Sequence, residues 1–74
     1  MKDDAKRLGN NLKKLRTERG ITQIEIAQTL GSDRSFVSNI ENGKTNPTLS
    51  TIANLAKALK IPVSDLFKEI HVKH

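Results

Sequence analysis

The sequence contains no cysteine, no tryptophan and no tyrosine, and each absence excludes a class of protein. Without cysteine the chain has no disulfide framework, no cysteine-based metal site and no thiol nucleophile, which is compatible with a reducing cytosol. Its two phenylalanines are its only aromatic residues. They offer no row of base-stacking platforms, so single-stranded nucleic acid is disfavoured as a target.

Long hydrophobic runs are also missing. No apolar stretch approaches the ~20 residues that span a bilayer, and the N-terminal MKDDAKRLGN lacks the apolar core of a signal peptide. The sequence has no catalytic serine and histidine set and no glycine-rich phosphate loop, so we expect no enzyme. His71 and His74 alone are a poor ligand set, so no metal or other cofactor is expected. These features predict a cytoplasmic protein that does not enter the membrane.

The chain does contain an excess of positive charge and enough apolar residues for one small core. Thirteen Lys and Arg residues against eight Asp and Glu give a net charge of +5. This charge favours a polyanionic partner but does not identify one. The 74 residues allow a single domain, which we place over residues 1–74 with its core in about residues 5–70. Such a small domain needs economical packing or help from an oligomer.

Residues 21–44 (ITQIEIAQTLGSDRSFVSNIENGK) carry two short helical patterns joined by a tight turn. Thr22 and Glu25 have the spacing of a capping box, in which each side chain satisfies a free backbone N–H at the start of a helix. Ile26 and Leu30 then lie on one face of that helix. The first pattern is therefore a helix with a well-marked beginning.

The turn and the second helix are marked by similar chemistry. Gly31 can adopt the left-handed conformation that ends a helix, and Asp33 is a strong N-cap for the next one. Val37 and Ile40 supply the inward stripe of this second helix, which Gly43 ends. The spacing predicts a helix-turn-helix whose second helix has a polar outer face able to read base edges: Arg34, Ser35, Ser38 and Asn39.

Three further helices are expected outside the motif. The first covers about residues 4–19 and carries the apolar face Leu8, Leu12 and Leu15. After a loop, Thr48 is the expected N-cap of a helix with a dense apolar stripe formed by Leu49, Ile52, Ala53, Leu55, Ala56 and Leu59. Pro62 interrupts that helix, and a short apolar face begins at Val63. The prediction is five helices and no strand.

The motif resembles the helix-turn-helix of phage lambda-type repressor and Cro regulators. The residues that carry the resemblance are small or apolar, namely Ile26, Ala27, Leu30, Gly31, Val37 and Ile40. The resemblance extends over roughly residues 8–67. Ser32 departs from the family, which usually has an apolar residue there, so either Ser32 or Asp33 can serve as the N-cap. The resemblance implies a compact, all-α, five-helix domain that binds double-stranded DNA and regulates transcription.

The same resemblance implies which residues contact DNA. The base-reading positions fall on Arg34, Ser35, Phe36, Ser38 and Asn39. An arginine can address guanine and an asparagine can address adenine, each with two hydrogen bonds. Phe36 is unexpected on an exposed first turn unless it touches a thymine methyl or packs back against the protein, and both alternatives stay open.

The resemblance also implies phosphate contacts and one structural pair. Gln23 matches a phosphate contact of the family at a helix N-terminus, where free N–H groups favour phosphate oxygens. The second candidate phosphate group consists of Asn42, Lys44 and Thr45, which are also ordinary residues for the end of a helix. Arg16 and Glu41 match a family ion pair that links the first and third helices, unless both simply face water.

One recognition helix reads only a few base pairs, so we expect a homodimer on a palindromic operator. The candidate interface is the last helix, with Val63, Phe67 and Ile70 facing the partner and Leu66 pointing inward. Alternatively, Phe67 fills the core of the monomer. RNA polymerase is a further candidate partner for such a regulator. The rival function is an antitoxin-like protein-interaction module that binds its operator only as a secondary role.

Overall fold

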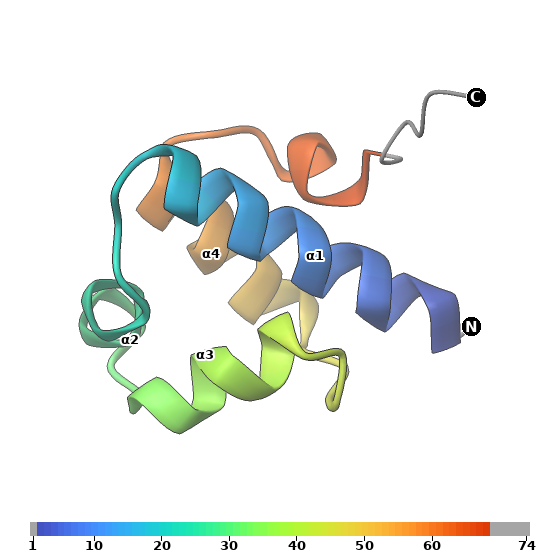
Figure 1. The fold of residues 1–74 in the computed structure, drawn as a ribbon, viewed down its shortest axis with the longest axis horizontal. Coiled ribbons are helices and arrows are strands. Elements are labelled where there is room, and N and C mark those ends of the chain that lie inside the picture. The colour runs from blue at the N-terminus through green and yellow to red at the C-terminus, as the bar shows by residue number, and fades with distance from the viewer. Residues whose placement is uncertain (1, 69–74) are drawn as a thin grey trace.

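A computed structural model of the protein describes residues 2–68, and within them the chain is helical and has no strand. Figure 1 shows α1 (Lys2–Glu18) running along the molecule above α3 (Arg34–Glu41), with α2 (Gln23–Leu30) at one end and α4 (Leu49–Leu59) behind α1. The last element is a short 3-10 helix, η1 (Val63–Phe67). The all-α class is therefore confirmed.

The expected count of five α-helices is wrong, because the fifth element is this single 3-10 segment. Pro62 precedes it, and Asp65 N donates to the Pro62 carbonyl at 3.0 Å. Lys68 then returns to extended backbone with φ −64° and ψ 143°. The bond from Asp65 to Pro62 joins residues three apart, as in a 3-10 helix, and not four apart as in an α-helix.

The helix-turn-helix has the boundaries that its capping residues predict. Glu25 N donates to Thr22 Oγ1 at 3.1 Å, and Thr22 N donates to Glu25 Oε1 at 2.8 Å, so the capping box is complete. Gly31 ends α2 at φ 70°, in the left-handed region. Phe36 N donates to Asp33 Oδ1 at 3.0 Å, so Asp33 is the N-cap of α3 and Ser32 is not.

The core is formed by apolar residues from every element. Its fully buried members are Leu12, Ile26, Val37, Ile40, Leu55, Leu59 and Leu66. Leu49 and Ala53 do not belong to it, although the apolar stripe of their helix predicted that they would. The Leu49 side chain is 82% exposed, because the first turn of α4 extends beyond the buried cluster.

Two residues of α1, the small Gly9 and the polar Asn11, determine how the other elements pack on this helix. A Cβ atom built on Gly9 would meet the Ile40 carbonyl and would lie 2.5 Å from the Glu41 carbonyl oxygen, so the backbones of α1 and α3 nearly touch there. The buried Asn11 donates through Nδ2 to the carbonyls of Leu66 and Lys68, at 2.8 and 2.7 Å. These two hydrogen bonds hold η1 against α1.

Candidate nucleic-acid interface

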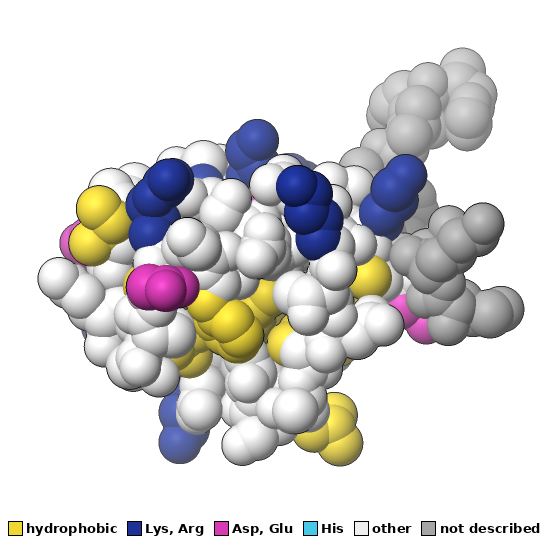
Figure 2. All heavy atoms as spheres, turned by 90° about the horizontal axis from the view of Figure 1, so that it is seen from below, with side chains coloured by type: hydrophobic (Ala, Val, Ile, Leu, Met, Phe, Trp, Pro, Cys, Tyr) yellow, Lys and Arg dark blue, Asp and Glu magenta, His cyan; other side chains and the backbone are white. Residues whose placement is uncertain are grey.

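The outer face of α3 is polar and accessible, while its inner face is buried. Arg34, Ser35 and Asn39 are exposed and Ser38 is half-buried, whereas Val37 and Ile40 are buried in the core. Figure 2 shows the molecule from the α3 side. Much of this face is white, the colour of uncharged polar side chains and backbone, with an apolar area near its middle and most of the visible basic side chains toward one margin. Such a surface can donate and accept hydrogen bonds without repelling phosphates.

Phe36 lies differently from its polar neighbours. It is half-buried and packs against the core cluster, as in the second of the two alternatives considered for it. Less of its ring is therefore available to a thymine methyl group.

Arg16 and Glu41 form a bidentate pair between α1 and the end of α3. Arg16 donates to the carboxylate through Nε at 2.6 Å and through Nη2 at 3.2 Å. Their side chains are 12% and 2% exposed, so the pair is shielded from water. Arg16 Nη1 also donates to the Ile21 carbonyl at 2.8 Å, which holds the chain just before α2. The pair thus joins α1, α3 and the start of the motif.

Gln23, the first residue of α2, lies between Arg34 and Glu41, the charged residues at the two ends of α3. Its Nε2 atom donates to Glu41 Oε1 at 2.9 Å. Its Oε1 atom accepts a hydrogen bond from Arg34 Nη1 at 3.1 Å. The second Nε2 hydrogen is not used by either bond, so a contact with a phosphate oxygen is still geometrically open.

The other candidate phosphate residues lie together in the loop that follows α3. Asn42 is the C-cap of that helix, and its Nδ2 atom donates to Ser38 Oγ at 3.4 Å. Lys44 is exposed, and its backbone N–H donates to the Asn39 carbonyl at 2.9 Å. Thr45 is half-buried beside it. These three residues follow α3 directly in the chain, whereas Gln23 is the first residue of α2.

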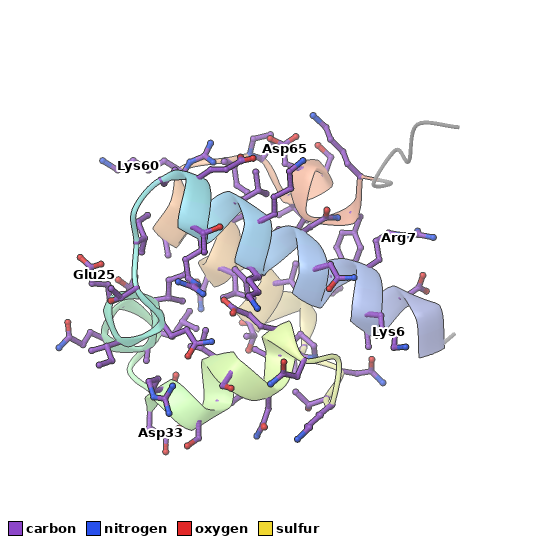
Figure 3. The ribbon with its side chains drawn as sticks, in the orientation of Figure 1. Lys6, Arg7, Glu25, Asp33, Lys60 and Asp65 are labelled. Atoms are coloured by element: carbon purple, nitrogen blue, oxygen red, sulfur yellow. The ribbon has the colours of Figure 1, made fainter. Side chains whose placement is uncertain are left out.

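Lys6 is a residue of this surface that the sequence analysis missed. A Cβ atom on Gly43 would lie 3.1 Å from Lys6 Cγ, so α1 passes directly over the loop after α3. Lys6 is exposed, and Figure 3 shows it near the end of α1 on the side of this loop. Gly9 is the sequence signal for this position of Lys6, because a glycine inside a helix marks the close approach of another backbone. Lys6 lies one helical turn before Gly9 and therefore on the same side of α1.

Two of the three residues expected at a dimer interface can be placed. Val63 is 41% exposed, whereas Phe67 is half-buried and packs against the core. Phe67 also lines a hollow of about 140 Å³ together with Leu8, Pro47 and Ile52. Its packing against the core agrees with the alternative in which Phe67 belongs to the core of the monomer. Leu66 is fully buried, and the expectation that it points inward is confirmed. Ile70 lies outside the described residues, as do His71 and His74.

No helix within residues 2–68 combines the length and the apolar character needed to cross a membrane. In the same part of the chain, no three side chains of His, Cys, Asp or Glu gather into a group that could hold a metal ion.

Two short helices joined by Gly31, Ser32 and Asp33, the second with a buried stripe and a polar outer face, define a helix-turn-helix DNA-binding domain. Residues 12–66 match the family described as Helix-turn-helix, and the chain belongs to that family. The resemblance seen in the motif residues is thereby confirmed.

The relatives of the chain are regulators. It is 41% identical over 71 residues to the control protein C.MunI of Mycoplasma sp, covering 95% of this chain and 96% of that one. The immunity repressor protein of Bacillus phage phi105 is 39% identical over 62 residues, covering 84% of this chain and 43% of the repressor. The crystal structure of the restriction-modification controller protein C.AhdI from Aeromonas hydrophila superposes with a TM-score of 0.84 at 39% identity, covering 89% of this chain and 96% of that one. The chain is a sequence-specific DNA-binding transcription regulator.

Proposed function

We propose that the protein binds a palindromic operator in duplex DNA as a homodimer and thereby controls transcription. The observation that carries this proposal is the outer face of α3, where exposed polar side chains stand on a helix anchored by buried Val37 and Ile40. The likeness in sequence and fold to controller proteins supports it. An antitoxin-like module has less support, because controllers and repressors stand among the relatives.

In this proposal α3 enters the major groove with its first residues toward the base edges, while α2 crosses the phosphate backbone. Arg34 donates to O6 and N7 of a guanine, and Asn39 pairs with N6 and N7 of an adenine. Ser35 and Ser38 can donate to or accept from several bases. Phe36 contributes by holding the first turn of α3 against the core.

Phosphate contacts surround this helix. Gln23 lies at the start of α2, where the free N–H groups of the helix favour phosphate oxygens. The loop after α3 supplies the other contacts through Asn42, Lys44 and Thr45. Lys6 adds a positive charge to that loop from α1.

We infer a homodimer because a single recognition helix reads only a few base pairs. Two copies related by a two-fold axis would place their α3 helices about 34 Å apart, one turn of DNA, and would require an inverted repeat in the operator. We place the interface at η1 and the residues after it, through Val63, Phe67 and Ile70. RNA polymerase is the further partner of such a regulator, which acts where the enzyme starts transcription.

Selection of bound sequences from random duplexes tests this function. The expected result is an enriched inverted repeat with half-sites about one helical turn apart. On that operator, Arg34→Ala should weaken binding by about 1–3 kcal/mol and relax the preference at one base position, because a bidentate base contact is lost. Fluorescence anisotropy on the operator and on a random duplex measures both effects.

Lys44→Ala is the contrasting variant in the same experiment. It should weaken binding to all duplexes alike and reduce the slope of log affinity against log salt by about one unit. If Arg34→Ala weakens the operator and the random duplex by the same factor, α3 does not read bases through Arg34. A pool without any enriched sequence would contradict the function itself.

A further inference from the structure

Asn42 and Gly43 are the only asparagine–glycine pair of the sequence, and they lie directly after α3. Asparagine is among the thermally labile residues of proteins. Its side-chain carbonyl carbon can be attacked by the backbone nitrogen of the next residue. The attack is easiest when that residue is glycine, because no Cβ atom shields the nitrogen. Asn42 is exposed, so its side chain is also open to water.

The reaction is a deamidation that consumes one water molecule and releases one ammonia. The Gly43 nitrogen loses its proton and bonds to Asn42 Cγ, the side-chain amide nitrogen leaves as ammonia, and a cyclic succinimide results. Water then opens the ring at either of its two carbonyl carbons. One opening gives aspartate, and the other gives isoaspartate, in which the main chain runs through the former side chain. In both products a neutral amide has become a carboxylate, which is ionised at neutral pH.

The folded structure opposes the first step, because the end of α3 holds the reacting atoms apart. Asn42 has ψ 4°, which turns the Gly43 nitrogen toward the backbone nitrogen of Asn42 and away from its side chain. Gly43 N–H donates to the Ile40 carbonyl at 3.1 Å. Lys44 N–H donates to the Asn39 carbonyl at 2.9 Å. Rotating ψ toward the side chain breaks both bonds, so ring closure requires the end of α3 to open.

A carboxylate at residue 42 would lie near two lysines that supply positive charge to this loop in the proposed function. Asn42 and Lys6 line one polar hollow of about 290 Å³. Lys44 follows two positions later in the chain and is exposed. A new negative charge here attracts both ammonium groups away from DNA and repels the phosphates directly. Isoaspartate in addition lengthens the main chain beside Gly43, which already packs closely against Lys6.

We propose that Asn42 is a deamidation site, that the end of α3 protects it, and that its conversion to aspartate or isoaspartate weakens DNA binding. The chemistry stands on the structure, while the effect on binding rests on the proposed function. Phosphates that contact the loop hold it closed, so a protein bound to its operator reacts more slowly than a free one. Operator occupancy thereby determines how long the regulator keeps its affinity.

The first test follows the reaction in the intact chain at mildly alkaline pH, where the backbone nitrogen loses its proton more readily. Peptide mass spectrometry locates the conversion in the folded protein, in the folded protein with the selected operator, and in the chain unfolded by guanidinium chloride. Asn42 should convert before every other asparagine. Folding should slow the conversion about 10-fold, which corresponds to an opening free energy of about 1.4 kcal/mol, and operator DNA should slow it further.

The second test is Asn42→Asp, which places one of the two products in the loop from the start. Fluorescence anisotropy should show about 10-fold weaker binding to the operator and to a random duplex alike, because a phosphate contact is lost and a like charge is added. The slope of log affinity against log salt should fall by about one unit. Asn54→Asp adds the same charge at an exposed position of α4 and should change the affinity by less than about 2-fold at physiological salt.

Asn42→Gln controls for other kinds of ageing during the incubation. It keeps an amide at this position, but its longer side chain closes a ring much more slowly. Whatever affinity this variant starts with should therefore persist while the wild type loses affinity. Asn42→Ser, which has no amide, should behave in the same way if glutamine disturbs the end of α3. Thermal melting verifies that each variant folds.

Several results would overturn the inference. Another asparagine could react first, the folded and unfolded chains could react at the same rate, or the folded protein could fail to react at all. A conversion that operator DNA does not slow, or an Asn42→Asp variant that binds as tightly as the wild type, would overturn it too. Failure of the proposed function would appear separately, as a selection that enriches no sequence.

Discussion

At the scale of single residues, the Glu41 carboxylate joins α3 to both α1 and α2. It accepts hydrogen bonds from Arg16 Nε, Arg16 Nη2 and Gln23 Nε2 while almost completely buried. Removing one partner of a buried pair is costly, because the other charge is left without compensation. We therefore expect Glu41→Ala to lower the free energy of unfolding by about 3 kcal/mol, as measured by urea denaturation.

The matched control is Lys57→Ala, an exposed residue of α4. It should change the free energy of unfolding by less than about 0.5 kcal/mol, as surface substitutions usually do. Equal midpoints of unfolding for the two variants would mean that the Arg16–Glu41 pair contributes nothing to stability.

At the scale of helices, the crossing of α1 and α3 positions the recognition helix relative to the rest of the domain. Gly9 permits this crossing, because a Cβ atom there would press against the carbonyls of Ile40 and Glu41. Gly9→Ala should therefore push the two helices apart and destabilise the fold by about 1–3 kcal/mol, although alanine has the higher helix propensity. Thermal unfolding followed by circular dichroism measures this effect.

Asn10→Ala provides the comparison on the same helix, since Asn10 is exposed. Alanine favours the helix at both positions, so this variant should be as stable as the parent or slightly more stable. If Gly9→Ala behaved in the same way, the close approach of α1 and α3 would not constrain the fold.

At the scale of the whole molecule, the exposed apolar residues limit where a second copy can bind. Val63 begins η1 and is 41% exposed, while Leu49 begins α4 and is 82% exposed. The wild-type protein should sediment as a dimer at tens of micromolar. Val63→Asp should remain folded but become monomeric and lose operator affinity, because a charge at an apolar interface is desolvated without a partner. Ile70→Asp should have the same effect.

Leu49→Asp makes a comparable change at another exposed apolar residue and should remain dimeric. If Leu49→Asp dissociates the protein and Val63→Asp does not, the interface lies on α4. Analytical ultracentrifugation of the three variants, with and without operator DNA, distinguishes these arrangements. A wild-type protein that stays monomeric in both conditions would contradict the proposed homodimer.

The ends of the helices in the motif were predictable from the sequence by itself, because they depend on residues close together in the chain. Thr22 and Glu25 are three residues apart, as are Asp33 and the N–H that it caps. Gly31 needs only its own backbone to adopt φ 70°. The helix-turn-helix and the outward polar face of α3 follow from these boundaries together with helical periodicity. The class of protein follows from the resemblance of the motif residues to a known family.

Only the tertiary structure decided how these helices meet. Gln23 and Glu41 are 18 positions apart, and Asn11 and Leu66 are 55 apart, so their hydrogen bonds depend on how whole helices cross. The same cause explains Leu49, which belongs to an apolar stripe by periodicity but lies beyond the reach of the core. Periodicity assigns a side chain to a face of its helix, and only the packing of the other helices determines which part of that face is covered.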